Sequence, residues 1–497
     1  MTSKKEVTTV IDAKIAHLDE LTKTFSVKEH AEEQIMVLVK ELRLGNILRS
    51  LHFEKLQGFT LASIFVVLIV FRLWGKTIGR ATVKNSRCLC NVSKNTLYRA
   101  LLNPRIDWRL FQTKMTLQLL AFLKKRKAEI EGQDNCVILD DTTFEKTGIH
   151  IEGVSKVFDH VAHGFVYGMK CLTLAFSDGK SCIPIDFSLH REKGKKKDYG
   201  LTSKQRKNQF QKHRNAKNPD YARKAECDET KLEMAKRMLK HAVGHGITFR
   251  YVLADSWFTC ESLIRAVREL CAGSVHYVGL VKMNPNLRYR QSTAKRLMNI
   301  HELIAKNERK ASHYCRKYKC KYIQLNVKMG DEHVRIFIIK YGKSANWKVL
   351  LTTDVSMQFV RAFELYEMRW GIEVIFKECR GYLGMGKCQS RSYNAQIADT
   401  TLCFILYQML AIVKRISEYE TIGDLFEAER EQLLALTLWK RTLEIVRHLL
   451  EVLSQEVGVN LLHCLSTVAL KPNADQSIQI WAHLLCDSDD YELPDLS

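Results

Sequence analysis

Three acidic positions in the sequence could bring carboxylates together. Asp140 and Asp141 follow a short apolar run, Asp255 follows a second one, and Glu373 lies in a segment with helical spacing. The apolar runs predict buried strands, and ligands of open α/β sheets bind at the carboxyl ends of strands. Converging carboxylates bind divalent cations, and a pair of such ions stabilises the oxygens that attack and leave in phosphoryl transfer. The alternative is that each aspartate only forms a turn.

Glu373 belongs to a polar stripe on its predicted helix. The members of the stripe recur at intervals of three or four residues: Tyr366, Arg369, Glu373, Lys377 and Arg380. At about 3.6 residues per turn they share one helical face. A solvated salt-bridge face has the same spacing, but it does not explain the tyrosine or the neighbouring Trp370. The cations and the phenol could instead hold phosphates beside a cleaved bond.

The charge of the chain favours a polyanionic partner. The 497 residues include 77 Lys and Arg against 55 Asp and Glu, a net charge of +22. Such a charge favours nucleic acid as the partner. Residues 191–224 hold 13 Lys and Arg against three acids, and we expect a loop or arm there that either contacts DNA or is solvated. A short predicted helix before Pro104 could enter DNA or expose a solvated face, with the candidate contacts Lys94, Asn95, Tyr98 and Arg99.

The periodicity of apolar residues predicts an α/β (α+β) fold in five regions. They are a helical DNA-binding region (1–130), the first part of a catalytic domain with the basic arm (131–282), a β-rich insertion (283–355), a catalytic helix region closing the core (356–410) and a helical region with a possible role in dimerisation (411–497).

Two other classes of protein are disfavoured by the sequence. The apolar run 58–71 has 14 residues, too few to span a bilayer, and no signal peptide is evident at the N-terminus. The 15 cysteines form no CxxC pair, which favours reduced thiols over disulfides or a zinc site. We therefore expect a cytoplasmic protein without membrane partners.

The helical stripe resembles a known signature. The string Tyr366-x2-Arg369-x3-Glu373-x6-Arg380 is similar to the Tyr-Arg-Glu-Lys signature of a large group of DDE insertion-sequence transposases. Arginine stands at position 380 where the signature has lysine, and Lys377, one turn earlier, could partly substitute for it.

Two upstream segments resemble the aspartate motifs of the same group. Residues 139–143 (LDDTT) are similar to the first motif and residues 253–258 (LADSWF) to the second. The pattern Asp-x-Thr of the first motif fits both Asp140 and Asp141, and the sequence Asp-Thr-Thr favours Asp141. Because neighbouring side chains in a strand point to opposite faces, only one of the two is expected to be a metal ligand.

The resemblance implies a ribonuclease-H-like catalytic core, with a β-rich insertion between Asp255 and Glu373 and helical regions on either side. It implies cut-and-paste transposition through a hairpin intermediate, with two Mg²⁺ or Mn²⁺ ions per active site. The implied ligands are Asp141 (or Asp140), Asp255 and Glu373, and a flipped base would enter an aromatic pocket for which Trp257 and Trp370 are candidates.

The implied partners are double-stranded DNA, as terminal inverted repeats and target, and a second copy of the chain in a synaptic homodimer. The resemblance further implies a prokaryotic, nucleoid-associated protein. The alternatives are an inactive relative that keeps DNA binding, a basic nucleic-acid-binding protein without catalysis, and a metal nuclease without strand transfer.

Overall fold

The computed structural model describes residues 44–51, 61–73, 78, 92–125, 135–284, 286–291, 296–309, 312–342, 346–416, 421, 422 and 464. The chain divides into two units, Met1–Ala100 with Tyr419–Ser497 and Leu101–Glu418. The predicted dimerisation role of 411–497 falls almost wholly outside the described residues.

The described helices of the first unit are α2 (Leu44–Arg49), α3 (Leu61–Leu73) and most of α5 (Lys94–Leu101). Helix α3 contains most of the apolar run and buries Leu68 and Phe71. Helix α5 is the predicted short helix, and the Ser93 hydroxyl accepts a hydrogen bond from the Thr96 amide at its start, at 3.2 Å. Its four candidate DNA contacts are all exposed: Lys94, Asn95, Tyr98 and Arg99. Their contact with DNA stays a prediction.

A mixed sheet forms the centre of the second unit. Its five main strands lie in the order β4 (Cys182–His190), β3 (Gly164–Ser177), β1 (Cys136–Glu145), β5 (Tyr251–Ala254) and β6 (His276–Leu280). Strand β1 is antiparallel to β3 and parallel to β5, and β5 is parallel to β6. Residues Val137, Ile138 and Leu139 are fully buried, as expected for a strand covered on both faces. The arrangement is consistent with a ribonuclease-H-like fold.

The predicted β-rich insertion extends this same sheet. Strand β11 (Lys348–Thr352) pairs antiparallel with β6, and the sheet continues through β10 (Glu332–Tyr341), β9 (Cys320–Met329) and β7 (Arg290–Gln291). The remaining elements of this end are β8 (Ser312–Cys315), which pairs with β9, and α11 (Ile300–Asn307). At the opposite end, β2 (Ser155–Asp159) pairs with β3.

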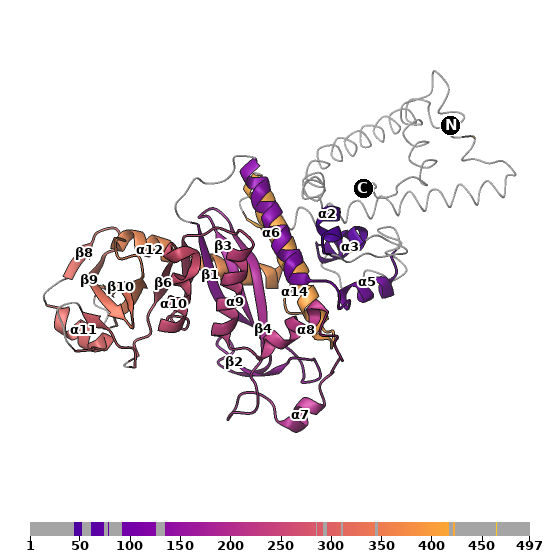
Figure 1. The fold of residues 1–497 in the computed structure, drawn as a ribbon, viewed down its shortest axis with the longest axis horizontal. Helices are drawn as coiled ribbons and strands as arrows, with labels where there is room; N and C mark the ends of the chain where they lie inside the picture. Colours follow the sequence, from indigo (N-terminus) through magenta and orange to yellow (C-terminus); the bar gives the residue numbers. More distant parts are fainter. Residues whose placement is uncertain are drawn as a thin grey trace, which may run out of the picture. The chain divides into compact units, whose positions relative to one another are not determined.

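Helices pack against the sheet and carry the polar stripe. They are α6 (Trp108–Lys125), α9 (Lys231–Gly244), α10 (Glu261–Arg268), the short 3-10 helix η3 (Leu270–Gly273), α12 (Phe359–Glu367), α13 (Trp370–Gly381) and α14 (Tyr393–Ile416). Helix α6 runs alongside α14 (Figure 1). Among the described helices, α14 alone has the length and apolarity needed to cross a membrane, but 94% of its apolar stretch is buried in the fold, as in a core helix.

The basic segment 191–224 is folded, contrary to the expected loop or arm. It contains α7 (Ser203–Lys207) and α8 (Pro219–Ala225), and the 3-10 helix η2 (Glu226–Asp228) follows it. Acids outside the segment pair with three of its four arginines: Arg191 lies 2.6 Å from Asp228, Arg214 2.5 Å from Glu152, and Arg223 2.7 Å from Glu226. These pairs hold the segment on the unit, and its charge alone could not reveal them.

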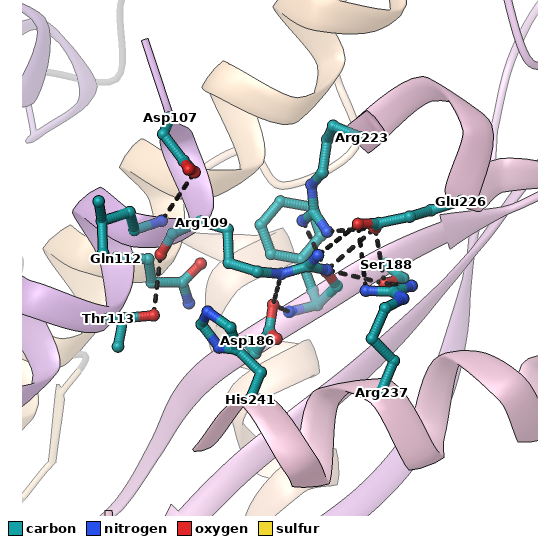
Figure 2. Close-up of polar contacts among 12 residues, drawn as sticks. Asp107, Arg109, Gln112, Thr113, Asp186, Ser188, Arg223, Glu226, Arg237 and His241 are labelled. Carbon is teal, nitrogen blue, oxygen red and sulfur yellow. Dashed lines mark hydrogen bonds and ion pairs between the residues drawn. The ribbon is translucent and has the colours of Figure 1, made fainter. Parts of the chain in front are cut away.

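A buried ion cluster ties helices to the strand β4 (Figure 2). Arg109 of α6 donates to Asp186 Oδ1 at 2.9 Å and to Glu226 Oε2 at 3.0 Å. Arg223 donates to Glu226 Oε2 at 2.7 Å and to the carbonyl of Phe187 at 2.6 Å. The side chains of Arg109, Asp186 and Glu226 are 12%, 4% and 9% exposed. Buried charges persist only when they are paired, so the cluster fixes α6, α8 and η2 against β4.

His241 of α9 gives this cluster a pH dependence. Its Nδ1 lies 3.8 Å from Asp186 Oδ2. Burial lowers the pKa of His241 most, Arg109 and His245 lower it further, and Asp186 and Asp107 act in the opposite direction. The unfolded chain therefore takes up this proton at higher pH than the fold does, and stability is lost as the pH falls from about 6.5 through the lower folded pKa.

We expect His241→Asn to flatten that dependence. The measurement is the urea midpoint at about pH 7.5 and about pH 5.5, in the wild type and the variant. The wild type should lose more stability than the variant between the two values. Equal losses would show that His241 does not contribute.

Candidate active site

The pleat of β1 separates the two neighbouring aspartates. Asp140 faces the junction between α12 and α13, where Arg369 Nη1 lies 3.0 Å from Asp140 Oδ2. Asp141 faces α9 instead, and its carboxylate lies 2.8 Å from Lys231 Nζ and 3.6 Å from Lys170 Nζ. Opposite faces are what a strand imposes on neighbouring residues. The geometry therefore favours Asp140 as the aspartate that shares a site with the polar stripe, and not the expected Asp141.

Asp255 lies beside Asp140. Strands β1 and β5 run parallel with Leu139 opposite Ala254, so the residue that follows in each segment is an aspartate. Strand β5 ends there, whereas β1 continues to Glu145, so Asp140 lies in the middle of β1 and not at its carboxyl end as expected. The pKa of Asp140 is raised to about 7, chiefly by burial and next by the charge of Asp255. Asp255 Oδ1 also accepts the Trp257 amide at 2.9 Å. Two carboxylates this close repel each other and favour a cation between them.

Arg369 connects the third carboxylate to this pair. Its Nη2 lies 2.5 Å from Glu373 Oε1, while its Nη1 contacts Asp140. Tyr366 lies in the same surroundings, because burial raises its pKa to about 12 and the charges of Asp255 and Asp140 raise it as well. The arrangement involves three segments that are far apart in sequence: β1 with Asp140, the end of β5 with Asp255, and the pair α12 and α13 with Tyr366, Arg369 and Glu373.

The stripe is carried by two helices rather than one. Helix α12 ends at Glu367 and α13 begins at Trp370. Met368 and Arg369 keep nearly helical backbone angles, with φ of −59° and −56°. The helical phase of the stripe therefore continues across the break, and Arg369 and Glu373 still meet.

The other members of the stripe lie apart from the carboxylates. Arg380 donates to the Thr142 hydroxyl and, at 2.9 Å, to the Thr143 carbonyl, so it lies against β1. Lys377 is exposed. Both tryptophans are also at the surface, with Trp370 62% and Trp257 42% exposed, which argues against core packing for either.

The donor set fits a hard divalent cation in its chemistry. Three carboxylates supply the oxygens that Mg²⁺ and Mn²⁺ prefer, and the raised pKa of Asp140 reflects negative charge gathered in a buried place. Among the described residues, however, no group of three acidic, histidine or cysteine side chains is close enough to hold a metal. The Arg369 guanidinium occupies the space between Asp140 and Glu373, and it would have to turn away.

Sequence reasoning missed two residues of the site. Lys231 bridges Asp141 and Trp257, with Nζ 4.5 Å from the centre of the indole ring. The capping box of Thr230 and Glu233 marks the start of its helix, but nothing in the sequence names its partner. Gly371 is the second residue that was missed, because a glycine near the start of a helix is only a weak indication of close packing.

Gly371 lets α13 approach β4 closely. A Cβ at this position would lie 2.9 Å from Cys182 Cβ and 3.0 Å from its Sγ. We expect Gly371→Ala to cost about 1–3 kcal/mol of unfolding free energy, because α13 would have to move away from β4. The measurement is the free energy of unfolding in urea.

Gly381, the last residue of the same helix, is the matched control. A Cβ there meets nothing within 4 Å. Gly381→Ala should leave the free energy of unfolding unchanged or raise it slightly. Equal behaviour of the two variants would contradict the close contact.

Two family models match parts of the chain. The family model described as DDE superfamily endonuclease matches residues 78–296, and the one described as transposase DDE domain matches residues 220–409. No curated protein matches the chain. The two family matches support a DDE transposase family and a nuclease-type enzyme that acts on DNA, a class that generally uses divalent metals.

Proposed function

We propose that this chain is a DNA transposase that cleaves and rejoins phosphodiesters at Asp140, Asp255 and Glu373. The observation that supports the proposal is that Arg369 contacts both Asp140 and Glu373, while Asp255 follows the strand paired with β1 beside Asp140. Asp140 replaces Asp141 as the proposed first ligand because Asp141 is paired with Lys231 on the other face.

The three carboxylates would hold two Mg²⁺ or Mn²⁺ ions, which when bound polarise the phosphate and activate the attacking oxygen. Tyr366 and Arg369 are placed to hold the phosphate at the cleaved bond, and Lys377 and Arg380 to hold flanking phosphates. The exposed rings of Trp257 and Trp370 remain candidates for stacking on a flipped base.

The finer steps follow the resemblance to the Tyr-Arg-Glu-Lys group. They are hydrolysis at the element end, attack of the freed 3′-OH on the opposite strand to form a hairpin, hydrolytic opening, and joining to target DNA. Two copies of the chain would bring the terminal inverted repeats together in a synaptic complex. We propose that this takes place at the nucleoid of a prokaryotic cytoplasm.

The test is cleavage of a labelled duplex that carries the end of the encoding element, with Mg²⁺, by the wild type and Glu373→Gln. The wild type should cut, and the variant should bind the duplex but fail to cut. Binding without cutting by both proteins would favour the inactive, DNA-binding alternative. Undiminished cutting by Glu373→Gln would refute the site.

A further inference from the structure

Residues 194–200 form a closed loop, called here the lysine loop. Its ends meet so closely that a Cβ on Gly200 would lie 1.6 Å from the carbonyl oxygen of Gly194, and both glycines have positive φ. Lys196 and Tyr199 exchange backbone hydrogen bonds of 3.1 and 2.8 Å, and the Gly200 amide donates to Lys156 at 2.8 Å. The loop therefore has a defined shape.

Aromatic rings support the loop on the hairpin of β2 and β3. The ring of Tyr199 packs edge-on against Phe165 with centroids 4.8 Å apart, and Phe165 packs on Phe158 at 5.3 Å. Lys156 Nζ lies 5.6 Å from the centre of the Phe165 ring. These contacts fix the backbone of the loop that carries the lysines before any ligand binds, which reduces the entropy lost on binding.

The lysines of the loop lack the acidic partners that the nearby arginines have. Lys195, Lys196 and Lys197 are exposed, and none forms an ion pair with a residue that the structure describes. By contrast, each of three arginines in the same segment is paired with an acid: Arg191, Arg214 and Arg223. Three consecutive cations with one neighbouring acid, Asp198, repel each other and attract an anion.

Contacts through β4 and β3 link the residues next to the loop with the strand that carries the aspartates. Glu192, two residues before the loop, has its Oε1 3.6 Å from His190 Nε2. His190 of β4 is paired with Lys170 of β3, and Lys170 Nζ lies 3.6 Å from Asp141 Oδ2 in β1. The lysine loop and β1 are therefore joined through neighbouring strands of one sheet.

We propose that the lysine loop binds the phosphate backbone of duplex DNA beside the bond cleaved at Asp140, Asp255 and Glu373. The inference rests on the proposed function and adds a DNA contact outside the catalytic helices. Lysine ammonium groups bind phosphates as point charges, so the contact positions the duplex without reading its sequence.

The test measures binding of the full chain to a labelled duplex of about 40 base pairs in EDTA, over a range of salt concentrations. The variant combines Lys195→Gln, Lys196→Gln and Lys197→Asn; asparagine suits position 197, where φ is +48°. Affinity at low salt should fall about tenfold or more, and the slope of log Kd against log salt should shrink by about 2–3.

A matched control removes the same charge from β9 and the turn before it. The control variant combines Lys319→Asn, Lys321→Gln and Lys328→Gln. All three lysines are exposed, and Lys319 also has a φ of +48°. The slope of log Kd against log salt for the control variant should stay near that of the wild type. An unchanged slope in the loop variant, or equal losses in both variants, would overturn the inference.

Two further measurements distinguish a failure of this inference from a failure of the proposed function. Thermal denaturation shows whether the triple variant is folded; if it is not, Lys195→Gln and Lys196→Gln are measured singly, each expected to reduce the slope by about 0.9. A wild type that neither binds nor cuts duplex DNA would refute the proposed function. A wild type that binds, with a loop variant that binds identically, refutes only the lysine loop.

Discussion

Asp140→Asn is expected to reduce DNA cleavage by about 10³-fold or more, while Asp141→Asn reduces it by about tenfold at most. Losing a carboxylate that holds a metal removes several kcal/mol of transition-state stabilisation, and about 4 kcal/mol corresponds to a factor of 10³. Asp141 is instead paired with Lys231 at 2.8 Å and Lys170 at 3.6 Å. Asparagine has nearly the same volume as aspartate, so the comparison isolates charge.

The measurement is the single-turnover rate of duplex cleavage in Mg²⁺, with duplex binding measured separately. Both variants should bind DNA at least as well as the wild type, because each removes a negative charge near the phosphates. A larger loss in Asp141→Asn than in Asp140→Asn would reverse the assignment of the two aspartates.

Arg109→Ala is expected to destabilise the fold by about 3–5 kcal/mol, since it leaves buried carboxylates without their partner. Arg109 contacts both Asp186 and Glu226, whose side chains are 4% and 9% exposed. Arg223 and Arg237 still contact Glu226. Asp186 would keep the Phe187 amide at 2.7 Å but lose its only arginine among the described residues, with His241 at 3.8 Å. The measurement is the free energy of unfolding in urea.

The control for this prediction is an ion pair at the surface. Arg265 lies 2.7 Å from Glu261, with side chains 50% and 45% exposed. Exposed pairs contribute about 0–1 kcal/mol, so Arg265→Ala should cost far less than Arg109→Ala. Similar costs for the two would mean that the cluster in Figure 2 does not hold the helices on β4.

The positions of Asp140 and Asp255 could be predicted because local signals define them. Each follows a short apolar run, and each run forms a buried strand. Parallel pairing of β1 with β5 then places Asp140 beside Asp255, although β1 does not end at Asp140 as expected but continues to Glu145. The choice between Asp140 and Asp141 could not be made, because it depends on which face of β1 receives α13, a matter of packing between segments far apart in sequence.

Two other features could not be predicted from the sequence, because they also depend on packing between segments that are far apart in the chain. The break between α12 and α13 leaves the helical spacing intact, so the pattern from Tyr366 to Arg380 is that of one helix. The acids that fold the segment 191–224, Glu152, Glu226 and Asp228, all lie outside it. A high density of positive charge within a segment predicts a loop only when no acidic residue elsewhere in the chain pairs with it.

The central claim is that Asp140, Asp255 and Glu373 form one site for divalent cations. Crystals soaked in Mn²⁺ and measured at its absorption edge test it directly, without reference to activity. We predict an anomalous peak among these three carboxylates, with Arg369 turned away from Asp140, and no such peak in Asp140→Asn crystals. A peak at Asp141 instead, or Glu373 pointing away from both aspartates with Mn²⁺ present, would contradict the claim.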